Sequence, residues 1–109
     1  MSEAGIHSVV AVQLSEREAA WVYSIETAAR ITHIPRRRIA LYYKHGLVQP
    51  VADPEQGGWY FDDRALRTLR RIEALREAWG LNLPAIKLVL DLMAEVERLQ
   101  EEIRFLRGR

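Results

Sequence analysis

The chain of 109 residues contains no cysteine, and none of its apolar runs approaches the ~20 residues that cross a bilayer. The first absence excludes disulfides and thiolate metal sites, and the second excludes a membrane-spanning helix. The N-terminus also lacks the basic patch and apolar core of a secretion signal. We therefore expect a cytoplasmic protein with one modest domain, an appended helix, and no metal or cofactor.

Patterns of catalytic residues are also missing. The three histidines lie far apart in the sequence, and no Ser-His-Asp order, phosphate-binding loop or metal-ligand spacing occurs. Asp62 and Asp63 form an acidic pair, but their place before an apolar periodic segment favours helix capping over acid–base chemistry. We expect a protein that is not an enzyme and has no catalytic residue.

Charge is distributed unevenly, although the formal net charge is only +1. Eight of the 16 Lys and Arg residues lie between Arg36 and Arg71, whereas the segment from Asp91 to Glu102 carries five acids and one arginine. A basic middle and an acidic tail predict two surfaces with different tasks.

Capping and turn residues predict two short helices. Ser24 is suited to cap a helix of two turns, Pro35 opens a second helix, and Gly46 ends that helix just after His45. The apolar face of the first helix is formed by Ile25, Ala28, Ala29 and Ile31. Two short helices joined by a tight turn predict a helix-turn-helix, in which the second helix is offered to a partner.

Turn residues flanked by apolar ends make residues 48–61 a predicted β-hairpin or wing. Asp62 or Asp63 then caps a long helix that runs through Trp79 and ends at Gly80. One face of this helix carries Leu66, Leu69, Ile72, Leu75 and Trp79. Before the helices, "SVVAVQL" suits a short strand and "SEREAAW" a helical fragment, but neither pattern is sustained. We divide the chain into an arm (1–21), a winged helix-turn-helix domain (22–80) and a last helix (81–109).

The last helix has Asn82 as its expected N-cap and Pro84 in its first turn. It carries a heptad stripe whose apolar residues alternate spacings of three and four. The stripe consists of Val89, Leu92, Val96, Leu99, Ile103 and Leu106. A stripe of this kind either packs back onto the protein's own core or pairs with a second copy. We favour a homodimer seam, because the remaining helices suffice to close a small core.

The order helix, turn, helix, wing, long helix and dimerisation helix resembles the MerR family of winged helix-turn-helix regulators. The likeness rests on "YSIETAARITHIPRRR", "GLVQP", "GGWYFDD" and "LRRIEALREAWGLNLPAIKLVLDL", and it covers residues 22 to about 107. The tail and "WYFDD" most resemble the chaperone-linked branch, which contains HspR-type repressors and CbpM chaperone modulators. The resemblance implies a mainly α winged helix-turn-helix fold with a C-terminal dimerisation helix.

The resemblance also implies binding of a double-stranded DNA operator by a homodimer that regulates transcription, with links to chaperone genes. Arginines at the start of the second helix suit phosphate and guanine contacts, and Tyr42 and Arg37 match family positions expected to contact DNA. The predicted DNA-binding residues are Arg36, Arg37, Arg38, Tyr42, Lys44, Arg64 and Arg67. The basic face of the long helix has an equally weighted alternative, a solvated surface without a partner.

Two positions depart from the DNA-binding pattern. With Gly46 aligned, the family's arginine before the paired tyrosines falls on Ala40, and the arginine of its wing falls on Trp59. Each lost phosphate contact weakens DNA binding and lowers its salt dependence. The alternative function is therefore that of a CbpM-like modulator, which binds the J-domain of a DnaJ-type co-chaperone. Tyr43, Leu41, Trp59 and Phe61 are expected to be packing residues, although an exposed Trp59 would be a natural anchor for a protein partner.

Overall fold

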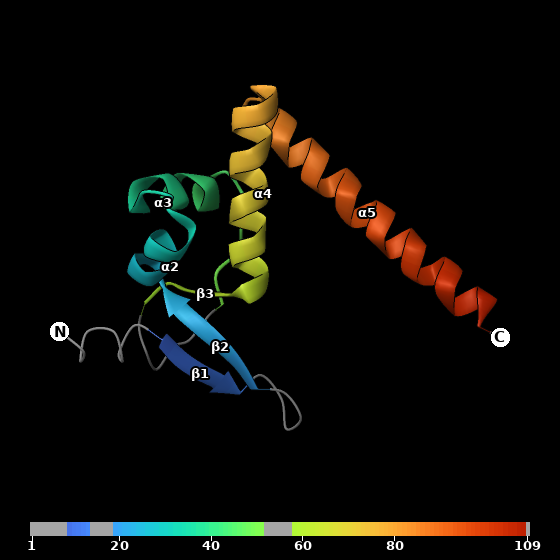
Figure 1. Cartoon of the computed structure of the whole chain (residues 1–109), viewed down its shortest axis with the longest axis horizontal. Coiled ribbons are helices and arrows are strands. Elements are labelled where there is room, and N and C mark those ends of the chain that lie inside the picture. The colour runs from blue at the N-terminus through green and yellow to red at the C-terminus, as the bar shows by residue number, and fades with distance from the viewer. Residues whose placement is uncertain (1–8, 14–18, 52–57, 109) are drawn as a thin grey trace.

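The computed structural model describes residues 9–13, 19–51 and 58–108. In this part of the chain, four helices and a three-stranded antiparallel sheet alternate with short turns (Figure 1). The elements in chain order are β1 (Val9–Gln13), β2 (Ala19–Ser24), α2 (Ile25–Thr32), α3 (Arg36–Lys44), β3 (Tyr60–Asp62), α4 (Asp63–Trp79) and α5 (Leu83–Arg107). The predicted class, a mainly helical winged helix-turn-helix with a C-terminal helix, is confirmed.

The helix boundaries follow the predicted caps. Ser24, Asp62 and Asn82 each stand at an N-cap, where the side-chain oxygen accepts a hydrogen bond from the backbone N–H three residues on. Gly46 and Gly80 have φ of 75° and 65°, the left-handed conformation that glycine adopts without strain. Local chemistry therefore sets where α2, α4 and α5 begin and where α3 and α4 end.

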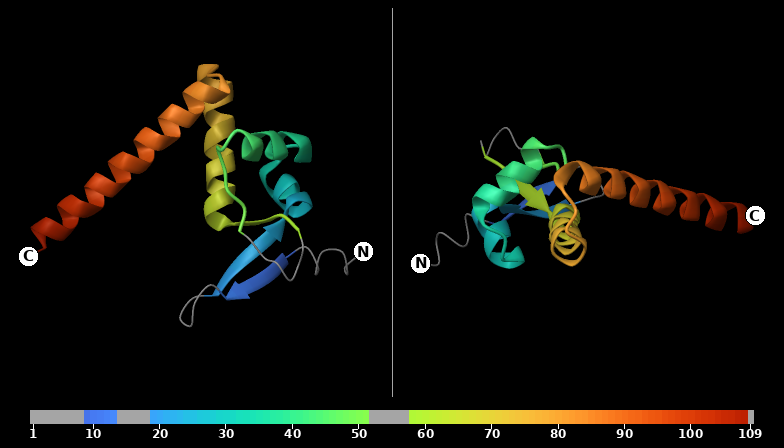
Figure 2. Two further views of the ribbon diagram at one scale, coloured as in Figure 1. Left: turned by 180° about the vertical axis from the view of Figure 1, so that it is seen from behind. Right: turned by 90° about the horizontal axis from the view of Figure 1, so that it is seen from above.

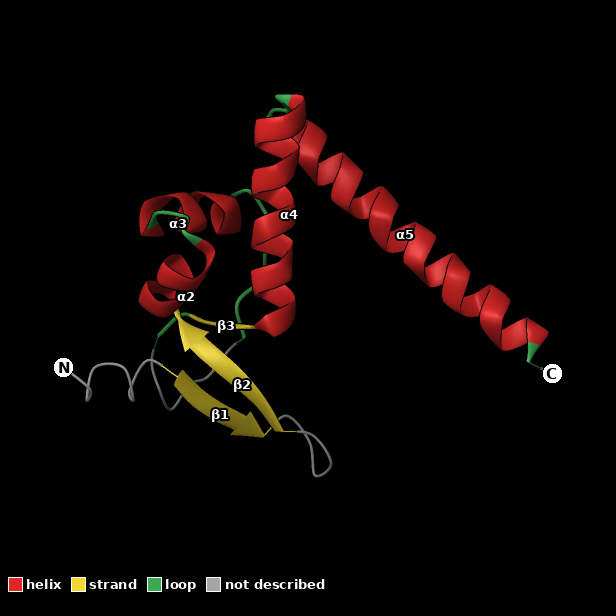
Figure 3. Ribbon diagram, in the orientation of Figure 1, coloured by secondary structure: helices red, strands yellow, loops and turns green. Residues whose placement is uncertain are grey.

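The sheet lies at one end of the helices and joins the N-terminal segment to the wing (Figure 3). β1 pairs with β2 from Val9↔Tyr23 to Gln13↔Ala19, and β2 pairs with β3 from Val22↔Asp62 to Ser24↔Tyr60. The strand expected within "SVVAVQL" is thus present as β1. Residues 19–21, within the stretch that suited a helical fragment, belong to a strand instead, because they pair with residues 11–13 of β1.

The two ends of the predicted wing meet in an antiparallel bridge between Val51 and Tyr60. Residues 52–57 of the wing, including Asp53 and Glu55, lie outside the described residues. β2 continues across the predicted boundary between arm and domain at residue 21. That division, and the boundary after residue 80, stay predictions.

The core forms where α2, α3, α4 and β3 meet. Its fully buried side chains include Val22, Ile39, Tyr42, Phe61, Leu69 and Ile72. α5 adds Ile86, its one buried residue among those described, and otherwise leaves the domain at an angle to α4 (Figure 2). Since α5 has 25 residues, it extends roughly 37 Å at 1.5 Å per residue. Most of this helix therefore lacks a packing partner within the described chain.

Three large apolar side chains of α2, α3 and α4 are exposed. Trp79 is 74% exposed at the end of α4, whose last turn lies beyond α3 (Figure 1). Ile31 and Leu41 are also exposed, since each lies on the outer side of its short helix. The prediction that Leu41 is a packing residue is wrong, and the apolar faces of α2 and α4 do not bury Ile31 and Trp79.

Candidate interaction surfaces

The three adjacent arginines of α3 have different surroundings. Arg36 lies 3.3 Å from the carboxylate of Glu26 on α2, and Arg38 donates a 3.0 Å hydrogen bond to Glu73 on α4. Arg37 is exposed and makes no salt bridge within the described residues. Two of the three guanidinium groups are therefore partly neutralised by carboxylates of the same chain.

Tyr42 is fully buried, and its hydroxyl is used inside the protein. It donates a short hydrogen bond to Glu73 and accepts one from Arg76 at 2.9 Å. Burial, followed by the hydrogen bond to the Glu73 carboxylate, raises the pKa of Tyr42 to about 12. Since its single proton is donated to Glu73, this hydroxyl has none to donate to a phosphate group in this conformation.

Glu73 is the centre of this network, which joins α3 to α4. Its carboxylate accepts from Arg38 and Tyr42 and lies 3.8 Å from Arg76, while its side chain is only 15% exposed. A partly buried carboxylate with charged and neutral donors fixes the orientation of α3 on the domain. Glu73 was not among the predicted residues, because Arg38 and Tyr42 lie more than thirty residues away on another helix.

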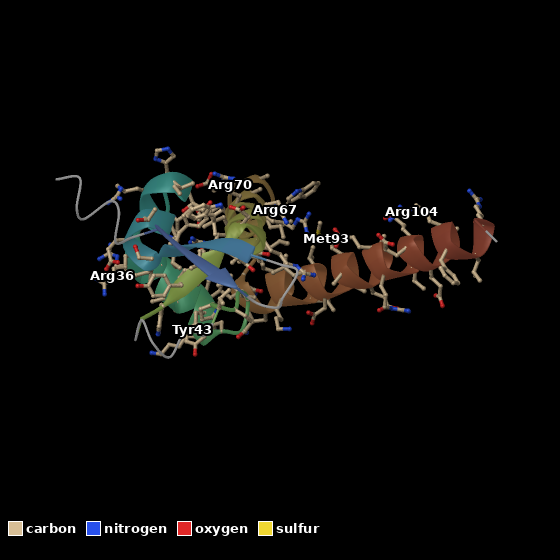
Figure 4. The ribbon with its side chains drawn as sticks, turned by 90° about the horizontal axis from the view of Figure 1, so that it is seen from below. Arg36, Tyr43, Arg67, Arg70, Met93 and Arg104 are labelled. Atoms are coloured by element: carbon tan, nitrogen blue, oxygen red, sulfur yellow. The ribbon has the colours of Figure 1, made fainter. Side chains whose placement is uncertain are left out.

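The other predicted DNA-binding residues lie on two helices. Lys44 is exposed at the end of α3, and Arg64 and Arg67 are exposed on α4. None of the three forms a salt bridge in the part of the chain that the structure describes. Figure 4 shows Arg67 on one side of the ribbon and Tyr43 of α3 on the other. The predicted DNA-binding residues thus come from α3 and α4, and their role stays a prediction.

The heptad stripe of α5 is accessible. Val89 is half-buried, whereas the remaining stripe residues are each between 41% and 59% exposed, and no described segment covers them. A shallow hollow of about 340 Å³ follows the stripe and is bordered by Val89, Leu92, Val96 and also Met93. Met93 is not an a or d position, so the heptad spacing alone did not include it.

Charged pairs flank the stripe along α5. Lys87 bonds Asp91 at 3.0 Å, and Arg98 bonds Glu95 at 2.6 Å. The Arg98 guanidinium lowers the pKa of Glu95 from its usual value, and Glu95 in turn raises the pKa of Arg98. Pairs at these spacings support the isolated helix and keep its acids charged beside the apolar seam.

A second hollow lies between the start of α2, the outer side of α3 and the start of β3. It has a volume of about 400 Å³, and its lining includes Arg36, Ala40, Trp59 and Tyr60. Trp59 is 42% exposed, and its ring packs against Tyr43 with centroids 4.7 Å apart. Ala40 and Trp59, the two departures from the DNA-binding pattern, thus border the same space. Trp59 therefore packs on one side, as expected, and presents the other to solvent.

Residues 9–13, 19–51 and 58–108 contain neither a cluster of metal ligands nor a membrane-spanning helix. No group of three or more His, Asp or Glu side chains is arranged to hold a metal ion. No described helix has the length and apolar character to cross a membrane.

Comparison with known families matches residues 23–108 to the MerR HTH family regulatory proteins. The chain belongs to this family. Similar proteins include the chaperone modulatory protein CbpM of Salmonella paratyphi B, Salmonella newport and Salmonella heidelberg, each 41% identical over 61 residues. The matched segment spans 56% of this chain and 59% of each relative's length. The resemblance to a MerR-like, chaperone-linked branch is confirmed, and neither the family nor these relatives are named for catalysis.

Proposed function

We propose that this MerR-family chain is a homodimeric chaperone modulator that binds the J-domain of a DnaJ-type co-chaperone and limits its access to DnaK. It acts in the cytoplasm, where such a partner resides, and uses neither a catalytic centre nor a cofactor. The observation that carries the proposal is the internal neutralisation of α3. Arg36 and Arg38 are paired with carboxylates, and the Tyr42 hydroxyl is bonded inside the domain.

A helix that reads DNA depends on cations that are free to replace the counterions of the phosphates. Here the partly buried pair of Arg38 with Glu73 opposes that role, and two phosphate contacts of the family pattern are absent at Ala40 and Trp59. An exposed aromatic ring beside a hollow is instead typical of the anchor positions of protein–protein interfaces. The 41% identity to proteins named chaperone modulatory protein CbpM also supports a protein partner.

The homodimer rests on the stripe of α5. Six apolar side chains project from a helix that contributes a single buried residue to its own domain among the described residues. Burying each side chain against a second copy contributes about 1.5 kcal/mol or more before entropic costs. Antiparallel pairing, which the family resemblance implies, sets the two domains at opposite ends of the seam.

Titration calorimetry tests the function directly. The full-length chain is titrated with the purified J-domain of the DnaJ-type protein from the same organism, and we expect saturable binding with a dissociation constant of about 10 µM or tighter. The J-domain of a second co-chaperone from that organism serves as a specificity control. Absence of heat and of co-elution with every J-domain of the organism would remove this function.

DNA binding is the second candidate, favoured by the cations that remain open. Arg37 and Lys44 on α3, and Arg67 on α4, are exposed and have no salt bridge among the described residues. Binding to a duplex from the promoter of the organism's DnaJ-type gene is measured at several salt concentrations. For an operator-binding protein, Arg37→Ala weakens binding and lowers the salt slope by about one unit while the fold is unchanged. Equal affinity of the wild type and this variant would exclude a DNA role for α3.

A further inference from the structure

The hollow between α2, α3 and β3 has the features of a docking site for one particular kind of protein segment. Its lining is mixed, with the exposed ring of Trp59 on the β3 side and the guanidinium of Arg36 on the α3 side. Its volume of about 400 Å³ exceeds that of any single side chain and lies at the small end of ligand sites. The space therefore fits one or two side chains of a partner.

Small residues keep this space open. Ala40 lies on the α3 side and Gly58 on the β3 side. A Cβ atom added to Gly58 would lie 3.4 Å from the ring of Tyr60, which is ordinary van der Waals contact. A Cβ atom at Gly58 would therefore not clash with the backbone. A larger side chain at Ala40 would instead occupy the hollow itself.

The hollow is bordered by one base, Arg36, and one acid, Glu26, which pair with each other. Arg36 and Glu26 are 67% and 53% exposed, and an exposed ion pair contributes little to stability. An incoming carboxylate can therefore take Arg36 from Glu26 at low cost. Arg37 and Lys44 add positive charge on the same helix and have no acidic partner among the described residues. The net positive potential of α3 favours a segment that brings its own negative charge.

We propose that this hollow receives an apolar side chain of the partner against Trp59 while a neighbouring carboxylate of the same segment pairs with Arg36. The inference rests on the proposed function for the identity of the partner, and it adds the contact surface and the chemistry of the segment. The apolar side chain supplies affinity through burial against the ring, and the carboxylate supplies orientation and a faster encounter. This face of α2, α3 and β3 is then the binding surface of the domain.

Calorimetric titration of the full-length chain with the J-domain named above tests the surface. Ala40→Leu fills the hollow with a residue that favours helices, and Trp59→Ala removes the ring; each is expected to weaken binding by at least about tenfold. Arg36→Gln is expected to weaken binding by about threefold to tenfold near 0.05 M salt, with a smaller effect near 0.5 M. Arg70→Gln, an exposed arginine on α4 lying on the opposite side from Tyr43, is the charge-matched control (Figure 4).

Circular dichroism of each variant reports folding, and Ala40→Leu keeps the test valid where Trp59→Ala unfolds the wing. If the wild type binds the J-domain and both Ala40→Leu and Arg36→Gln bind it equally well, the docking site is overturned and the proposed function stands. A wild type that binds no J-domain overturns both. Variants that lose duplex binding but keep the J-domain would assign this face to DNA and also overturn the inference.

Discussion

Replacing Glu73 with glutamine tests whether the carboxylate between α3 and α4 neutralises and positions the basic helix. The wild-type side chain is 15% exposed and accepts from Arg38 and from the Tyr42 hydroxyl. A hydrogen bond to a charged group contributes about 1.5–3 kcal/mol. Glutamine keeps one acceptor oxygen but loses the charge and the second acceptor, so we expect a loss of about 2 kcal/mol.

Thermal unfolding at one fixed protein concentration measures the loss, because the midpoint of a dimer depends on concentration. At roughly 4 °C per kcal/mol for a chain of this size, the midpoint should fall by about 8 °C. Glu77→Gln, an exposed acid one turn further along α4, is the control and should change stability by no more than about 0.5 kcal/mol. Glu73→Gln should also bind a non-specific DNA duplex more tightly than the wild type, because Arg38 is released. An unchanged midpoint together with unchanged duplex binding would refute the reasoning.

Three further predictions concern the network, the seam and the helix turn. The folded-state pKa of Tyr42 lies above the ordinary value of 10, so its stabilising contribution is complete below about pH 10 and is lost as pH rises through about 12. Tyr42→Phe should remove this alkaline step when the free energy of unfolding is measured against pH. A step of equal size in both proteins would contradict the network. Leu99→Asp should halve the mass measured by light scattering, because it places a charge in the seam. Ala94→Asp, which lies opposite the stripe by helical spacing, should leave the mass unchanged. A dimer that survives Leu99→Asp would place the seam elsewhere. Gly80→Ala should lower the free energy of unfolding by denaturant by about 1 kcal/mol, because φ at this position is 65°. Gly108→Ala, where φ is −78°, should leave it nearly unchanged. Equal effects of the two substitutions would remove backbone strain as the cause.

Features that depend on local chemistry were predictable from the sequence. The caps at Ser24, Asp62 and Asn82 and the left-handed glycines at Gly46 and Gly80 all stand where the sequence places them. Each depends on hydrogen bonds or steric freedom within a few residues, so the surrounding fold changes them little. The class of fold follows from these boundaries and the apolar periodicity between them.

Features that depend on distant partners were not predictable in the same way. The sheet needs β2 to meet β3, and the carboxylates that neutralise α3 come from α2 and from the middle of α4. The spacing of Arg36, Arg37 and Arg38 carries no information about Glu73, and the family position of Tyr42 does not reveal that its hydroxyl is bonded internally. The hollow beside Trp59 likewise exists only where three elements converge.

We expect this chain to pair through α5 and to bind a protein partner rather than an operator. Sedimentation of the full-length chain mixed with the J-domain of its DnaJ-type co-chaperone tests that claim most directly. We predict one complex whose mass corresponds to two chains and two J-domains, and a dimer when the chain sediments alone. A monomer that sediments independently of the J-domain would contradict both halves of the claim.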